Sequence, residues 1–111
     1  MQIQINNQRG GEALATTVTG MLEQALTRFS EHVTRLEVHI TDENGKKGGK
    51  DDKRCVMEAR MEGRKPVAVI ENAPTAMQAV EGAIHKLLRM LDSTVGKQQE
   101  HRRNMPELPA D

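Results

Sequence analysis

One stretch, residues 75–91, constrains the fold of this chain more than any other part of its sequence. Thr75 and Gln78 have the spacing of a capping box, a side-chain pair that begins many helices. The apolar residues that follow at helical spacing are Val80, Ile84, Leu87 and Leu91, widened by Met77, Ala83, Leu88 and Met90. The pattern predicts a helix whose broad apolar stripe must pack on other elements.

The opposite side of this helix is polar and partly cationic. Lys86 and Arg89 are three residues apart, so both are expected to face outward with His85 beside them. If the helix continues past Gly96, further basic residues prolong the line, namely Lys97, Arg102 and Arg103. Lysine and arginine bind phosphate groups. From the residues alone, however, an ordinary solvated helix face is the favoured interpretation.

The rest of the chain predicts one more helix and four strands. Apolar residues step by three and four through residues 12–29, which is typical of an amphipathic helix. Strands are predicted at residues 1–6, 35–41, 54–61 and 67–71. In the third strand the expected core positions are Cys55, Met57, Ala59 and Met61. The first two strands flank a helix and are therefore parallel if they are adjacent.

These elements predict an α+β fold of order βαβββα. Its four-stranded mixed sheet carries both helices on one face and leaves the other face largely polar. One domain is expected over residues 1–103, followed by a disordered tail at 104–111. No apolar run reaches membrane-spanning length and no secretory signal precedes the domain, so a cytoplasmic location is expected.

The same segments resemble a known family. The order Ala-Val-Glu-x-Ala-x-x-Lys-Leu-x-Arg-x-Leu at residues 79–91 is similar to A-I-D-x-A-x-D-K-L-x-R-Q-L of the ribosome hibernation-promoting factors and ribosome-associated inhibitors. Residues 11–29, 34–41 and 53–61 look like the first helix and the second and third strands of that family. The resemblance covers nearly the whole chain to about Arg103, and Lys86 and Arg89 fall on motif positions.

Charge is unevenly distributed along a chain that is neutral on average, with sixteen basic and sixteen acidic residues. Residues 46–65 carry a net charge of +4 and residues 86–103 carry +3, which leaves −7 for the remainder. The first window holds a loop at residues 42–52 that is expected to form a long hairpin tip. Its cations, with two that follow, are Lys46, Lys47, Lys50, Lys53 and Arg54. Charge runs alone favour an ordinary solvated loop.

The sequence contains no recognisable set of catalytic or metal-binding residues. Cys55 is the only cysteine and is expected in the core, as free cysteines usually are. The four histidines are scattered, so no metal site is expected. Phe29 is the only aromatic residue, which argues against a protein that stacks RNA bases on aromatic rings. We therefore expect no enzyme, no cofactor and no small-molecule substrate.

The family resemblance implies a stasis factor of the short type that binds the 30S ribosomal subunit. It would contact 16S rRNA phosphates and block the tRNA and mRNA channel. The implied contact residues are His85, Lys86, Arg89, Lys97, Lys46, Lys47, Lys50, Lys53 and Arg54. The alternative is a protein-binding or weakly self-associating module that uses the sheet edge or the polar sheet face without binding ribosomes.

Overall fold

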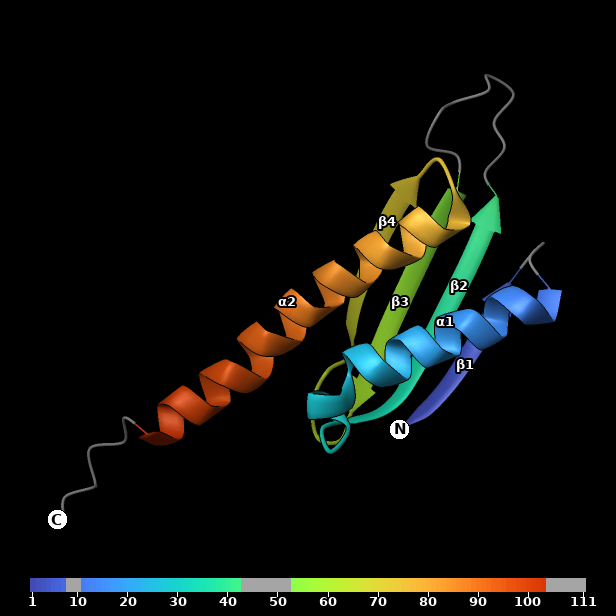
Figure 1. The fold of residues 1–111 in the computed structure, drawn as a ribbon. Coiled ribbons are helices and arrows are strands. Elements are labelled where there is room, and N and C mark those ends of the chain that lie inside the picture. The colour runs from blue at the N-terminus through green and yellow to red at the C-terminus, as the bar shows by residue number, and fades with distance from the viewer. Residues whose placement is uncertain (8–10, 43–52, 104–111) are drawn as a thin grey trace, which may run out of the picture.

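The chain folds as a four-stranded sheet with two helices on one of its faces (Figure 1). The computed structural model describes residues 1–7, 11–42 and 53–103, with the backbone alone for residues 96–103. The elements are β1 (Gln2–Asn7), α1 (Gly11–Ala25), the short 3-10 helix η1 (Thr27–Phe29), β2 (Val33–Asp42), β3 (Lys53–Met61), β4 (Val67–Ala73) and α2 (Ala76–Arg103). The predicted order βαβββα is confirmed.

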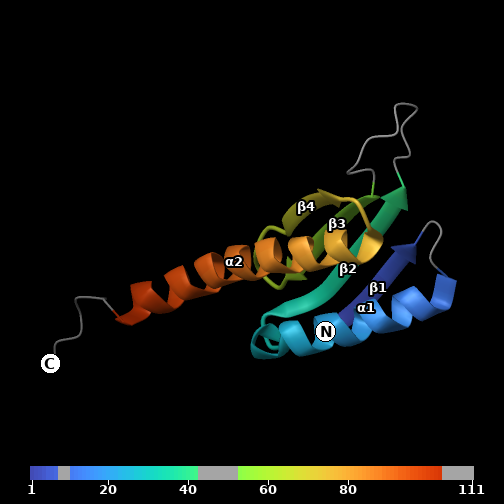
Figure 2. The same ribbon diagram turned by 45° about the horizontal axis from the view of Figure 1, so that its top comes forward.

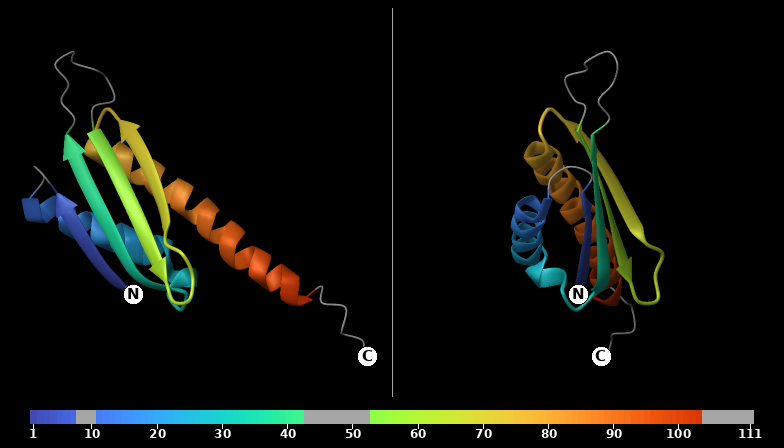
Figure 3. Two further views of the ribbon diagram at one scale, coloured as in Figure 1. Left: turned by 180° about the vertical axis from the view of Figure 1, so that it is seen from behind. Right: turned by 90° about the vertical axis from the view of Figure 1, so that its right-hand side faces the viewer.

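The strands lie in the order β1-β2-β3-β4. β1 runs parallel to β2, and the other two pairs are antiparallel, so the sheet is mixed. Seen edge-on, both helices lie on the same side and the opposite face is uncovered (Figure 3). The core fills the layer between sheet and helices, because alternate strand residues point to one face. The four expected core positions of β3 are all buried: Cys55, Met57, Ala59 and Met61.

α2 begins as its sequence predicts. The backbone N–H of Gln78 donates to Thr75 Oγ1 at 3.1 Å, which satisfies one of the free amides of the first turn. The second bond differs from that of a capping box: the Thr75 hydroxyl donates to Gln78 Oε1 at 3.2 Å, so it joins the two side chains and not the Gln78 side chain to the Thr75 backbone amide. Val80, Ile84, Leu87 and Leu91 are buried as expected. The helix is capped and amphipathic, and its stripe lies on β3 and β4.

The structure differs from the prediction in several details. The first helix ends at Ala25 and continues as η1, whose tighter turn brings Phe29 into the core. β4 extends two residues further, to Ala73, because it pairs with β3 as far as Lys53. Met90 was expected in the apolar stripe but is 43% exposed. It lies on the margin of that stripe, beside the exposed Arg89. The C-terminal part of α2 projects past the sheet (Figure 2).

Candidate nucleic-acid interface

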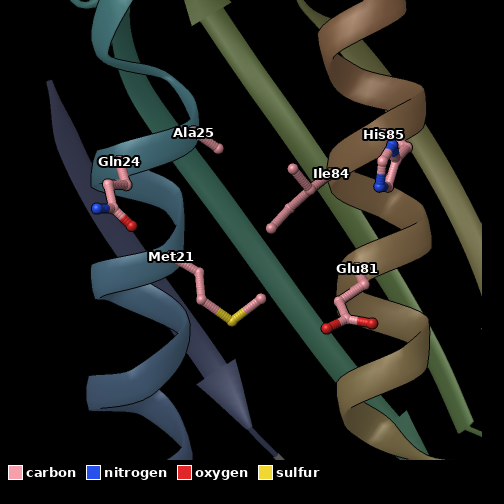
Figure 4. A pocket seen from close by; sticks show the side chains of 6 residues that line it. All are labelled: Met21, Gln24, Ala25, Glu81, Ile84 and His85. Carbon is pink, nitrogen blue, oxygen red and sulfur yellow. The ribbon is translucent and has the colours of Figure 1, made fainter.

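His85, Lys86 and Arg89 of α2 are all exposed, but their side chains do not form one cluster. His85 lies on the side of α2 that faces α1 (Figure 4). Lys86 reaches the other way, toward β4, where its Nζ donates to the backbone oxygen of Ile70 at 2.8 Å. Arg89 is exposed and has no ion-pair partner among the residues that the structure describes. A helix turns by about 100° per residue, so neighbours in sequence diverge in this way.

Lys86 is also held by an ion pair. Its Nζ lies 2.7 Å from Glu71 Oε1, and the Lys86 side chain is 52% exposed. The Glu71 side chain lies close to Gly82, since a Cβ at that position would be 2.6 Å from the other carboxylate oxygen and the side chain would have to shift. Half-exposed ion pairs stabilise a fold only modestly. The pair nevertheless places a carboxylate beside the lysine, which weakens the attraction of Lys86 for a phosphate group.

Lys53 and Arg54, at the base of the predicted hairpin tip, do not form one surface. Successive strand residues point to opposite faces, so Lys53 lies on the helix side and Arg54 on the open side. Lys53 Nζ lies 3.4 Å from Asp42 Oδ1, and both basic side chains are half-buried with partners. The lysines of the tip itself, Lys46, Lys47 and Lys50, and the side chain of Lys97 lie outside the described part of the chain.

The open face of the sheet is polar, as predicted, but its charges compensate one another. Arg35 lies opposite Arg60, and in the next row Glu37 lies opposite Glu58. Each arginine pairs along its own strand: Arg35 Nε is 2.8 Å from Glu37 Oε2, and Arg60 Nη2 is 3.4 Å from Glu58 Oε1. Pairing along each strand offsets the repulsion between like charges across strands. This face therefore presents no continuous positive charge in its described part.

Sequence reasoning missed two basic residues in the turn between β3 and β4. Arg64 Nη1 lies 3.5 Å from the backbone oxygen of Thr94, which places the turn against the second half of α2. Lys65 follows it and is exposed without an ion pair within the described ranges. Both lie inside the basic window 46–65, and that charge excess was the available signal. A turn is where exposed binding residues commonly occur.

A groove separates the two helices (Figure 4). Its volume is about 480 Å³, and it is lined by Met21, Gln24, Ala25, Glu81, Ile84 and His85. At its far end, Arg28 Nη2 forms an ion pair with Asp92 at 2.9 Å and so joins η1 to α2. The groove offers one carboxylate, Glu81, and one imidazole, His85, four residues apart on α2.

Cys55 is buried, as the sequence indicates. Its side chain is inaccessible, and burial raises the pKa of its thiol from the ordinary value of 9.0 to about 12. The reactive form of cysteine is the thiolate, which this environment disfavours.

Among the described residues there is also no group of three histidine, cysteine or acidic side chains that could hold a metal ion. None of the helices described is long and apolar enough to cross a membrane.

The raised pKa of Cys55 predicts a loss of stability at high pH. Between pH 9.0 and about 12 the unfolded thiol loses its proton while the folded thiol keeps it, so rising pH favours unfolding. The contribution of this one group is at most about 1.4 kcal/mol per pH unit. Denaturant unfolding of wild type and Cys55→Ala across this range measures it. The variant should show a shallower decline, and parallel declines would contradict the prediction.

Comparison with known proteins agrees with this fold. A family model described as "Sigma 54 modulation protein / S30EA ribosomal protein" matches residues 1–99. The N-terminal domain of Protein Y from Thermus thermophilus matches with a TM-score of 0.68 at 15% identity, over 85% of this chain and 99% of that one. A ribosomal subunit interface protein from Coxiella burnetii gives a TM-score of 0.65 at 16% identity, over 86% and 99%. No curated protein sequence matches the chain.

At these identities the two solved structures establish the shared fold alone. The family model goes further, because it spans nearly all of the folded chain from β1 into the second half of α2. It also includes the helix motif at residues 79–91 from which the resemblance was drawn. That resemblance is thereby confirmed, and the chain belongs to the family of sigma 54 modulation proteins and S30EA ribosomal proteins.

Proposed function

We propose that this chain is a ribosome-binding stasis factor that occupies the tRNA and mRNA channel of the small subunit. The observation that carries the proposal is the family match over residues 1–99, since the family includes ribosomal proteins by its description. One of the two structural neighbours supports it, because that protein is a ribosomal subunit interface protein. In this proposal the protein acts by occupancy in the cytoplasm and needs no catalytic step or cofactor.

The contacts in this proposal are ionic and directed at phosphates of 16S rRNA. Such contacts require exposed cations, and Arg89 and Lys65 meet that condition most directly. Phe29 is the only phenylalanine, tyrosine or tryptophan of the chain and is buried, so bases do not stack on such rings in this proposal. Lys86 and His85 are secondary contacts, because Lys86 is paired with Glu71 and His85 faces the groove between the helices.

The shape of α2 fits this mode of binding. The sheet ends beneath its middle, and residues 96–103 continue as a helix beyond the body of the domain (Figures 1 and 2). Lys97 lies on this projecting segment, whereas Lys46, Lys47 and Lys50 belong to the connection between β2 and β3. We include these four lysines in the proposed interface because they account for much of the positive charge of the two basic windows. Lys53 and Arg54 are peripheral, because both side chains are half-buried and already have partners.

Alanine substitutions at two neighbouring positions of α2 test the proposed interface. Arg89→Ala should weaken binding to 30S subunits by about tenfold, equal to about 1.4 kcal/mol, because a free cation is lost. Lys86→Ala should have a smaller effect, since its charge is already shared with Glu71. Co-sedimentation with purified 30S subunits at fixed low salt measures both variants.

Arg60→Ala is the matched control, because Arg60 is exposed on the open face of the sheet, opposite the helices. It should bind like the wild type. Unchanged sedimentation of the double variant Lys86→Ala with Arg89→Ala would contradict the proposed site. Absence of any wild-type protein in the ribosomal fractions would contradict the proposed function itself.

A further inference from the structure

The two edges of the sheet differ in how they are protected. An edge strand exposes unpaired backbone groups that can pair with another chain, and many proteins block this with lysine, proline or a covering element. At the β4 edge, Lys86 Nζ donates a hydrogen bond to the backbone oxygen of Ile70, which is then not available to another strand. α2 also passes beside this edge as it leaves the sheet (Figure 3). The β4 edge therefore has both a lysine and a covering helix.

The β1 edge has none of these features in its sequence. β1 reads QIQINN, without a charge, a proline or a glycine. One side of the strand pairs with β2 from Gln2 opposite Arg35 to Asn7 opposite Ile40. On its other side, no strand lies in the described part of the chain. Uncharged six-residue segments without proline or glycine can pair with copies of themselves.

The helix above β1 leaves room for such a partner. α1 crosses β1 obliquely, and its Gly11 end lies beyond the outer edge of the strand (Figures 1 and 3). Ile3 and Ile5 point toward the helix layer but are only half-buried. Apolar side chains on the inner face of an outer strand are thus incompletely covered. A neighbouring strand with its own helix would remove part of this surface from water.

We propose that two copies of this chain associate through antiparallel pairing of β1 with β1, which joins their sheets into one of eight strands. A two-fold axis perpendicular to the sheet keeps the isoleucines of both copies on the helix side and the amides Gln2, Gln4 and Asn6 on the open side. The overhanging end of α1 then lies over the start of the partner's β1, above Ile3. Because each strand has six residues, the interface is small and the dimer dissociates on dilution.

Two exposed positions at opposite edges allow a controlled test. The pairing registers place Gln4, Glu37, Glu58 and Ala68 in one row across the open face, with Gln4 on β1 and Ala68 on β4. In the register that we propose, Gln4 lies opposite Gln4 of the second copy. Gln4→Lys should then lower the association constant several-fold, because the two lysines face each other at the axis. Ala68→Lys adds the same charge at the β4 edge and should leave association unchanged. Sedimentation velocity over a range of protein concentrations measures both.

A charge-reversal mixture separates edge pairing from misfolding. Gln4→Glu alone should also dissociate, whereas an equimolar mixture of Gln4→Lys and Gln4→Glu should recover the dimer, because opposite charges then face each other. Circular dichroism of each variant should match the wild type. A wild type that stays near 12.4 kDa at all concentrations would overturn the proposal. Equal effects of Gln4→Lys and Ala68→Lys, or a mixture that stays dissociated, would overturn it as well.

Discussion

Replacing Leu87 with alanine is expected to lower the free energy of unfolding by about 2–5 kcal/mol. Leu87 is completely buried in the middle of α2, and its side chain belongs to the single core between sheet and helices. Removing it loses the transfer free energy of the buried carbons and leaves a cavity that the rigid sheet fills only in part. The change should lower the melting temperature by about 10 °C or more.

Thermal unfolding followed by circular dichroism measures this effect, and Met90→Ala is its control. Met90 lies three residues further along the same helix but is 43% exposed. Its truncation should change stability by no more than about 0.5 kcal/mol, as is usual at the surface. Equal losses for the two variants would mean that the packing of α2 on β3 and β4 is not what holds this helix.

Binding to the 30S subunit is expected to fall by about a thousandfold between 50 and 200 mM salt if six cations contact phosphate. The six in the proposed interface are Arg89, Lys65, Lys97, Lys46, Lys47 and Lys50. Each contact releases a condensed counterion, so the affinity depends on salt through the number of contacts made. Filter binding or co-sedimentation across a salt series gives this number as a slope of about −5 in a double-logarithmic plot.

The hairpin lysines contribute half of that slope in the proposal. Changing Lys46, Lys47 and Lys50 together to serine should therefore reduce it to about −3, since about three contacts remain. Arg60→Ala again serves as the control and should leave the slope unchanged. An unaltered slope in the triple variant would remove the hairpin from the interface, whereas a salt-independent wild type would rule out phosphate contact as the basis of binding.

The elements and the core were predictable because they follow from local periodicity. Period-two alternation located β2 and β3, and the spacing of Val80, Ile84 and Leu87 identified the buried side of α2. Their order and the parallel pairing of β1 with β2 followed from chain connectivity. Each of these patterns lies within one helix or strand or in the order of the elements, so it can be read from a single sequence without knowledge of tertiary contacts.

The candidate site was less predictable because it depends on contacts between elements. Lys86 and Arg89 look equivalent on a helical projection, yet only Lys86 meets the side chain of Glu71 on β4. This contact depends on the position of α2 over the sheet edge, and in its observed geometry the Glu71 side chain occupies the space beside Gly82. The separation of Lys53 from Arg54 follows instead from the period-two alternation of β3, which a count of charge ignores. Charge counted along the sequence cannot supply that information.

The projecting end of α2 has a practical consequence for experiments on this protein. The side chain of Val95, the last one that the structure describes, is buried, and from there to Arg103 the helix advances by about 12 Å, at about 1.5 Å per residue. A fluorophore attached near that end would be carried away from the domain on a helical spacer, so labelling there should leave folding undisturbed. The fluorescence anisotropy of the label and its accessibility to a quencher would then change when the end of α2 enters a narrow channel.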